Sequence, residues 1–367
     1  MDKENKNLDQ HLNDLRSNID KIDSKILNLI NQRLQLGKEI GQIKKKKKTD
    51  VLDSSREKQV IEKILKNNKG PAEEQLLKYI FNVIMTATKD IQKKQIVSYL
   101  GPEAGYPHIA SLNFFKHSGR FIERSNIYEV FRSTNRNESR FGVVPIENSI
   151  QGTVNNTLDL LTEFELIICG EQYLPVSYDL ISISGEITDI ETIYCTPQSL
   201  SQCKTWKNNN FPDVDIIETA SSAQASEIVL TKKNSAMIAN SQAAHIYSLQ
   251  LVESAIEDYP GNINRFLIIG KDAQPKTGND KTSIMFSTSH IPGALFNALE
   301  PINKAGLNML KLESRPTKNE NWSYYFFMDI HGHINDKLVD QTIESMRKAT
   351  LSLKILGSYP VFTKENN

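Results

Sequence analysis

The sequence lacks an excess of charge of either sign, because its 367 residues carry 44 basic and 44 acidic side chains. A nucleic-acid-binding surface needs concentrated positive charge. The one basic run, at residues 44–48, is typical of a solvated helix end. We therefore expect no nucleic-acid partner.

Cysteine and long apolar runs are also scarce. The spacing of Cys169, Cys195 and Cys203 matches neither a disulfide framework nor a metal site. No apolar stretch approaches the length that crosses a membrane, and the amino-terminal residues are polar. We expect a cytoplasmic protein that uses no membrane anchor, no metal and no organic cofactor.

Residues 1–93 show helical periodicity and no convincing strand. From Leu12 to Ile43, apolar residues recur at alternating steps of three and four, which is a heptad pattern. A second helix is expected from Ser54, and a third near Ile84. Helices of such unequal length cannot cover the long one, so we expect a homodimer or larger homo-oligomer in which the long helices pack together.

Arg33 interrupts the apolar row of the long helix. A guanidinium among apolar side chains loses its hydration and needs an anionic partner. Lys44 lies eleven residues further on, close to three helical turns, and shares this face, while Arg16 lies beside the row. The three cations predict a receptor for a small polyanion.

This region resembles the all-helical class of chorismate mutase. The resemblance implies that cations and an amide bind the carboxylates and ether oxygen of chorismate, so that its rearrangement to prephenate needs no nucleophile. Glu57 is explained equally well as the third residue of a capping box. The positions assigned to the site are Arg16 (from the partner subunit), Arg33, Lys44, Asp53, Arg56, Glu57, Thr88 and Gln92.

From residue 96 the periodicity changes to short apolar runs separated by helical segments. Runs such as 96–101, 141–146 and 265–270 are expected to be buried strands. The alternation predicts α/β architecture with largely parallel sheets, in one domain or in two lobes around a cleft. Residues 281–361 follow the βαββαβ order of the ferredoxin-like split motif.

The string VVPIENSIQG at 143–152 resembles prephenate dehydratase. The resemblance covers residues 96–272 and implies a periplasmic-binding-protein-like pair of lobes that converts prephenate to phenylpyruvate. It implies that Arg265 binds a substrate carboxylate, whereas Phe266 is expected in the core. Further matching segments are 99–108, 194–203, 219–225 and 262–269. The residues assigned to the site are Asn148, Ser149, Gln151, Asn264, Arg265 and Phe266.

Asn264 departs from the family, which has at this position a threonine whose hydroxyl assists loss of the ring hydroxyl. An asparagine amide donates a hydrogen bond but cannot pass a proton on. Two interpretations stay open. One is a bifunctional chorismate mutase/prephenate dehydratase of phenylalanine biosynthesis, and the other is a mutase fused to a non-catalytic sensor of aromatic acids. Other departures are Ala104, Gly105, Pro107 and Thr196.

The carboxyl-terminal region resembles the ACT domain appended to prephenate dehydratases, which implies feedback inhibition by phenylalanine. A glycine at a helix start permits close approach of a ligand, and the helix N-terminus favours its carboxylate. A solvated strand end with a local ion pair would explain Glu313 and Arg315 equally well. The effector positions are Gly293, Ala294, Leu295, Glu313, Ser314, Arg315 and Pro316.

The expected protein is thus a multidomain α and α/β chain. It comprises an all-helical dimerising domain (1–93), a two-lobed α/β domain (96–272) and an ACT domain (281–361). Its expected small-molecule partners are chorismate, prephenate and phenylalanine.

Overall fold

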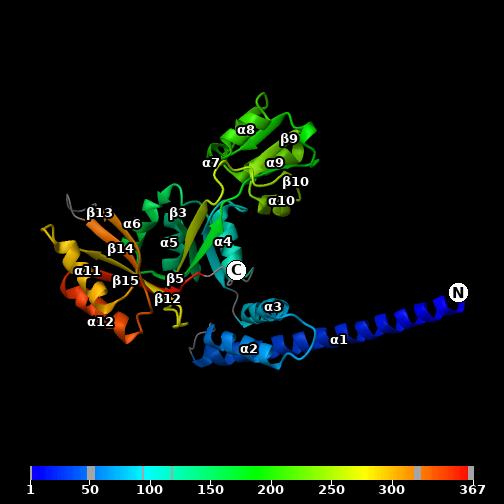
Figure 1. Ribbon diagram of the computed structural model, residues 1–367, viewed down its shortest axis with the longest axis horizontal. Helices are drawn as coiled ribbons and strands as arrows, with labels where there is room; N and C mark the ends of the chain where they lie inside the picture. The colour runs from blue at the N-terminus through cyan, green and yellow to red at the C-terminus, as the bar shows by residue number, and fades with distance from the viewer. Residues whose placement is uncertain (1, 48–53, 93–94, 117–118, 318–323, 363–367) are drawn as a thin grey trace. The chain divides into compact units, whose positions relative to one another are not determined.

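The computed structural model describes residues 2–47, 54–92, 95–116, 119–317 and 324–362 (Figure 1). The chain divides into two compact units, Met1–Gln95 and Ile96–Asn367, which we call the helical unit and the α/β unit. None of the helices in the described ranges is long and apolar enough to cross a membrane.

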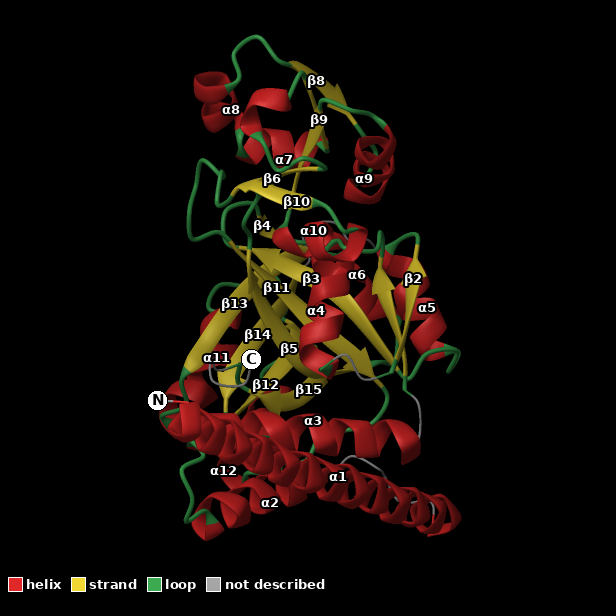
Figure 2. Ribbon diagram, turned by 90° about the vertical axis from the view of Figure 1, so that its right-hand side faces the viewer, coloured by secondary structure: helices red, strands yellow, loops and turns green. Residues whose placement is uncertain are grey.

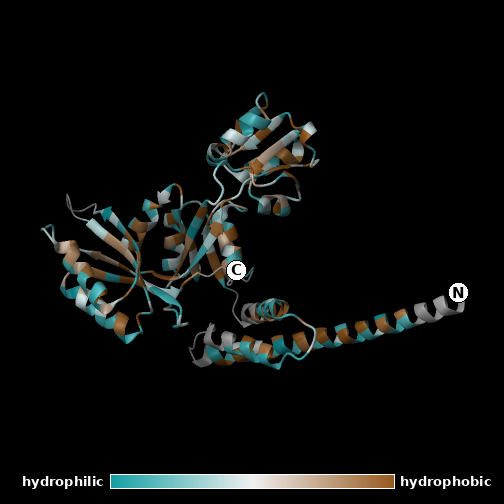
Figure 3. Ribbon diagram, in the orientation of Figure 1, coloured by the Kyte–Doolittle hydropathy of each residue, from teal (hydrophilic) through white to brown (hydrophobic). Residues whose placement is uncertain are grey.

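The helical unit consists of α1 (Asp2–Lys47), α2 (Ser54–Asn67) and α3 (Glu74–Gln92), as the periodicity predicts. α3 lies beside the carboxyl-terminal part of α1, whereas the amino-terminal part of α1 extends alone (Figure 1). The apolar row of α1 is therefore uncovered in a single chain, with Leu12, Ile26 and Leu29 being 46%, 48% and 63% exposed. Figure 3 shows apolar and polar residues alternating along this helix.

The first lobe of the α/β unit is a mixed sheet with strand order β2-β1-β3-β11-β5, with β4 paired to β3. Its strands are β1 (Ile96–Leu100), β2 (Arg120–Arg124), β3 (Phe141–Asn148), β4 (Gly152–Thr153), β5 (Ile167–Pro175) and β11 (Ile263–Gly270). Its helices are α4 (Tyr106–Phe115), α5 (Ile127–Asn135) and α6 (Asn155–Glu163).

The second lobe has its own mixed sheet, in the order β10-β6-β9-β7-β8. The chain enters it after β5 and leaves it before β11, so two segments connect the lobes (Figure 2). Its strands are β6 (Asp179–Ser182), β7 (Thr192–Cys195), β8 (Asp215–Glu218), β9 (Ser235–Ala239) and β10 (Gln250–Glu253). Its helices are η1 (Ile187–Asp189), α7 (Pro197–Gln202), α8 (Lys204–Asn210), α9 (Ser222–Thr231) and α10 (Ser241–Tyr247).

The prediction of two lobes is confirmed, but the prediction of largely parallel sheets is wrong. β1 runs parallel to β2 and β3, whereas β11 runs antiparallel to β3 and β5. The reason is the excursion to the second lobe, because the chain leaves along β5 and returns along β11 in the opposite direction. The carboxyl end of β3 therefore meets the amino end of β11, with Asn148 opposite Asn264.

The remaining elements form a βαββαβ module in which the antiparallel sheet has the order β13-β14-β12-β15. This is the ferredoxin-like arrangement that the element order predicts. α11 and α12 cover one face of the sheet (Figure 1). The elements are β12 (Asp280–Ser287), α11 (Ala294–Ala305), β13 (Met309–Pro316), β14 (Tyr324–His331), α12 (Lys337–Lys348) and β15 (Ser352–Pro360).

The other face of the module sheet shares a core with the first lobe. Met285, Phe327 and Tyr359 belong to one apolar cluster with first-lobe residues. Gly357 of β15, with φ 149°, approaches β5 so closely that a Cβ there would overlap the backbone of Ile168. The module is thus packed directly against the lobe that carries β3 and β11.

Candidate functional sites

Arg33 is half-buried on α1 and is bound by neutral groups of α3. Its Nη1 donates to Thr88 Oγ1 at 2.5 Å and to the Ile84 carbonyl at 3.3 Å. Burial lowers the pKa of Arg33 because desolvation disfavours the charged guanidinium. The side chains that the structure describes supply no carboxylate to Arg33. A desolvated cation held by neutral partners is suited to an anionic ligand.

The structure brings Arg33 and Thr88 together, as predicted, but it does not bring Arg16 to them within one chain. Arg16 is exposed on α1, seventeen residues before Arg33. That spacing is about 25 Å along a helix, too far for both side chains to reach one small ligand. Lys44 is half-buried near the carboxyl end of α1. Asp53 lies outside the described residues, as do the side chains of Arg56, Glu57 and Gln92.

A cluster of amide side chains joins the end of β3 to the start of β11. Asn148 Nδ2 donates to the Oδ1 atoms of Asn262 and Asn264, at 2.8 Å in each case. Asn148 Oδ1 accepts from the backbone N–H groups of Ile150 and Gln151, at 2.9 and 2.8 Å. The buried Asn148 is therefore fully hydrogen-bonded and fixes the turn after β3.

Ser149 and the second lobe complete this amide cluster. Ser149 Oγ donates to Asn262 Oδ1 at 3.2 Å and accepts from the Ile263 backbone at 2.9 Å. Asn262 Nδ2 in turn donates to Gln202 Oε1 of α7 at 3.5 Å. Gln202 was missed from the sequence, although it lies in the matching segment 194–203. The cluster therefore includes side chains of both lobes.

Thr196, which departs from the family pattern, has a structural function here. It is the N-cap of α7, and its side chain forms a capping box with Ser199. Another residue missed from the sequence, Asn240, connects the lobes elsewhere. Its Nδ2 donates to the carbonyl of Ala104, which has the left-handed φ of 61°. The hydrogen bond from Asn240 to Ala104 therefore connects the two lobes.

The geometry around Asn264 determines what the amide cluster can do. Asn264 is half-buried, and its Oδ1 accepts from Asn148. In the described part of the chain no acceptor is recorded for Asn264 Nδ2, which leaves an N–H donor for a ligand. An amide donor stabilises a departing hydroxyl but does not transfer a proton.

Arg265, which is predicted to bind a substrate carboxylate, is bound in this structure by carboxylates of the protein itself. Arg265 is 6% exposed, and its guanidinium donates to Glu171 and Asp329, at 2.9 and 2.7 Å. The cavity beside it is about 30 Å³, an order of magnitude below the usual size of a ligand site. Phe266 is 2% exposed and so belongs to the interior, as expected.

The candidate effector residues lie in two segments of the module, at the start of α11 and on β13. Ala294 and Leu295, at the start of α11, line a pocket of about 410 Å³ together with Tyr324 and Phe326. Gly293 precedes the helix in the left-handed conformation, φ 81°. Glu313–Pro316 lie on the edge strand β13, where Ser314 and Pro316 are the cross-strand partners of the pocket-lining Phe326 and Tyr324. Arg315 there binds Asp159 of α6 through two hydrogen bonds of 2.8 and 3.0 Å.

Comparison with known proteins identifies the family. Residues 15–93 match the family model described as chorismate mutase type II, and residues 97–274 match prephenate dehydratase. The bifunctional chorismate mutase/prephenate dehydratase of Aquifex aeolicus (strain VF5) is 40% identical over 96% of this chain and 98% of the relative. That of Stutzerimonas stutzeri is 38% identical over 94% and 96%. The chain belongs to the bifunctional chorismate mutase/prephenate dehydratase family.

Solved structures of prephenate dehydratases resemble the α/β unit. The enzyme of Arthrobacter aurescens, in complex with L-Phe, matches with a TM-score of 0.65 and 27% identity over 72% of this chain and 90% of that chain. The enzyme of Staphylococcus aureus subsp. aureus Mu50 matches with a TM-score of 0.64 and 26% identity over 72% and 99%. The resemblances to chorismate mutase and to prephenate dehydratase are confirmed, and membership of the bifunctional family favours the two-enzyme interpretation over the sensor.

Proposed function

We propose that this chain catalyses two consecutive reactions, the rearrangement of chorismate to prephenate and the conversion of prephenate to phenylpyruvate, in phenylalanine biosynthesis. The supporting observation is that one chain carries both a desolvated cation, Arg33, and an amide cluster around Asn148. Each lies in the segment that matches the corresponding enzyme family.

In the mutase reaction, Arg33 and Lys44 would bind carboxylate and ether oxygens and hold the substrate in its compact conformer. Thr88 positions Arg33 through their hydrogen bond. The reaction breaks one carbon–oxygen bond and forms one carbon–carbon bond without a proton transfer, so cationic donors that stabilise the ether oxygen suffice. Asp53, Arg56, Glu57 and Gln92 remain candidates for the same site.

A second copy of the chain is part of this proposal. The exposed apolar row of α1 would be covered by the α1 helix of a partner, and the partner's Arg16 would then reach the site. Coverage of such a row is favourable by roughly 1.5–3 kcal/mol for each large aliphatic side chain that becomes fully buried.

In the dehydratase reaction, Asn264 Nδ2 would donate to the ring hydroxyl as its carbon–oxygen bond breaks. Loss of carbon dioxide supplies the electron pair that completes the aromatic ring. Asn148 positions Asn264, while Ser149 and Gln151 lie at the same turn and are candidates for contact with the substrate. The proton needed by the departing hydroxyl comes from solvent, because an amide does not release one.

The βαββαβ module would act as an ACT domain, with boundaries near residues 281 and 361, and would bind phenylalanine for feedback inhibition. The pocket at the start of α11 has room for an amino acid, with apolar lining for a side chain. Because Ser314 and Pro316 pair across the strands with the pocket-lining Phe326 and Tyr324, Glu313–Pro316 would contribute to the same effector site. The three unpaired thiols fit a cytoplasmic location.

One assay tests both activities. Purified full-length protein receives chorismate, and prephenate and phenylpyruvate are measured separately. Arg33→Leu should reduce prephenate formation by about 10²–10³-fold, and Asn148→Ala should stop only the second step. Lys25→Leu, which removes an exposed cation of α1 outside the apolar row, is the matched control. Phenylpyruvate formation at the uncatalysed rate by the unmodified protein would refute the dehydratase assignment and leave the mutase standing.

A further inference from the structure

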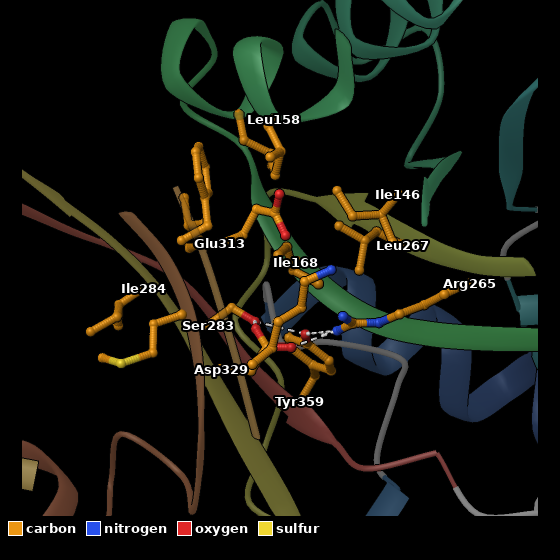
Figure 4. Close-up of a pocket in the computed structure, with 15 residues that line it drawn as sticks. Ile146, Leu158, Ile168, Arg265, Leu267, Ser283, Ile284, Glu313, Asp329 and Tyr359 are labelled. Carbon is orange, nitrogen blue, oxygen red and sulfur yellow. Dashed lines mark hydrogen bonds and ion pairs between the residues drawn. The ribbon is translucent and has the colours of Figure 1, made fainter. Parts of the chain in front are cut away.

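A set of buried and half-buried charges connects the first lobe to the βαββαβ module. At its centre, Arg265 Nη2 lies 2.7 Å from Asp329 Oδ2, and Nε lies 2.9 Å from Glu171 Oε2. Figure 4 shows Arg265 pointing at Asp329 and Tyr359. We call this set the charge cluster. Its six members are Glu147, Glu171 and Arg265 from the first lobe and Lys281, Lys311 and Asp329 from the module.

Strand geometry ties the charge cluster to the amide cluster. Successive side chains of a strand point to opposite faces. Glu147 therefore faces away from Asn148 in β3, and Arg265 faces away from Asn264 in β11. The register pairs Glu147 with Arg265 and Asn148 with Asn264. One cross-strand pair thus faces the module while the adjoining pair faces the candidate dehydratase site.

The ladder between β3 and β11 is irregular at this point. Arg265 pairs with Glu147, but Phe266 pairs with Pro145, so Ile146 is left without a cross-strand partner. Such a bulge bends the strand and changes the direction of neighbouring side chains. The orientation of Glu147 and Asn148 therefore depends on side-chain contacts as well as on the strand.

The module binds both members of the charged cross-strand pair. Lys311 Nζ, from β13, forms an ion pair with Glu147, at 2.6 Å from Oε2, and no aligned hydrogen bond of Nζ is recorded within the described residues. Asp329, from β14, binds Arg265 and also accepts a 2.5 Å hydrogen bond from Ser283 Oγ. The module thus contacts β3 and β11 on the face opposite to the one that carries Asn148 and Asn264.

We propose that Lys311 and Asp329 are positioning residues for the dehydratase reaction, acting through Glu147 and Arg265 on the amide pair Asn148 and Asn264. The inference rests on the proposed placement of the dehydratase site at this amide pair. Lys311 and Asp329 touch no substrate. They determine the orientation of the Asn264 side-chain N–H donor. A shift of the module at Lys311 would accordingly alter turnover more than substrate binding.

Lys311 offers the sharper test, because its side chain is 20% exposed whereas that of Asp329 is 10% exposed. The full-length variants are Lys311→Met, which removes the charge, and Lys311→Arg, which keeps it. Lys304→Met is the matched control, because Lys304 forms an exposed pair with Glu300 on α11 of the same module. For each variant, kcat and KM for prephenate, mutase kcat and Tm are measured.

We expect Lys311→Met to lower dehydratase kcat about tenfold while KM changes less than about twofold. Lys311→Arg should recover most of this loss, and Lys304→Met should equal the unmodified protein. Mutase kcat, from the separate helical unit, should not change in any variant. The proposal is overturned if Lys311→Met keeps full dehydratase kcat, or if its loss is not rescued by arginine and follows Tm alone.

Three other variants keep the test decisive. If Lys311→Met does not fold, Lys311→Glu is compared with the charge-swapped double variant Glu147→Lys/Lys311→Glu, in which recovery of kcat supports the coupling and no recovery refutes it. Asn148→Ala separates this inference from the site placement. Retained dehydratase activity in Asn148→Ala refutes the placement, whereas its loss beside an unaffected Lys311→Met refutes only the positioning role.

Discussion

The helical unit and the α/β unit differ in how they bury their apolar side chains. In the helical unit, the row on α1 from Leu12 to Ile43 is exposed, and Ile26 keeps 48% of its surface accessible. In the α/β unit, the apolar run of β3 is covered, and Val143 and Val144 are fully buried. The helical unit therefore exposes an apolar surface, whereas the α/β unit buries its apolar cores within a single chain.

The two candidate sites differ in the same way. Asn148 forms four hydrogen bonds to residues of its own chain, so the amide cluster is complete in one copy. Arg33 has two neutral partners and no described carboxylate, and Arg16 is about 25 Å away along α1. Mutase activity should therefore depend on assembly, and dehydratase chemistry should depend on internal alignment of the strands.

The variant expected to have the largest effect on one activity alone is Ile26→Asp. A carboxylate in the apolar row would be buried without a partner in a helical dimer, so the long helices should not pair. We expect mutase activity to fall by about 10²-fold or more, because the site loses the partner's arginine. Dehydratase kcat should stay within about twofold, since the α/β unit is separate.

Lys25→Asp is the control for Ile26→Asp, because it places the same charge on an exposed position outside the apolar row. Sedimentation and both activities are measured over a range of protein concentrations. For the unmodified protein, mutase specific activity should fall on dilution more steeply than dehydratase activity. Full mutase activity in monomeric Ile26→Asp would show that one chain forms the complete site.

The second test concerns the internally complete site. Asn264→Ala removes the proposed donor to the departing hydroxyl and should lower dehydratase kcat about 10²-fold. Asn264→Thr supplies a hydroxyl that both donates and accepts, so its kcat should equal or exceed that of the unmodified protein. Mutase kcat in the same preparations is the control. An active Asn264→Ala variant would remove Asn264 from the reaction.

Much of this contrast can be read from local sequence patterns. The heptad row predicts α1, and the short apolar runs predict strands that the structure contains. Arg33 and Thr88 are 55 residues apart, yet each lies on a predicted helical face, and the structure brings them into contact. Periodicity is sufficient here because the helical faces that the sequence periodicity defines are the faces through which the helices pack.

The errors come from long-range geometry. The direction of β11 depends on the path through the second lobe, which no local pattern records. The role of Arg265 depends on Glu171 and Asp329, which are 94 and 64 residues away. A motif can place Arg265 beside Asn264 in sequence, but only strand alternation and module packing show that the two side chains face different partners.

Thiol labelling should have the smallest effect on function. It compares the burial of the two units, because all three cysteines lie in the α/β unit. Desolvation raises the pKa of Cys169 to about 12 and that of Cys195 to about 11, and it also raises the pKa of Cys203. Their thiolate forms are therefore scarce in the folded protein between pH 7 and 9, where an unfolded thiol with a pKa of about 8.5 ionises. We expect slow labelling with little pH dependence in this range, retained activity, and three labelled thiols after unfolding.

Ser24→Cys on the exposed surface of α1 is the control, and its labelling should be fast and rise with pH. Rapid native labelling of Cys195 would mean that the second lobe opens more readily than the compact core of the α/β unit implies.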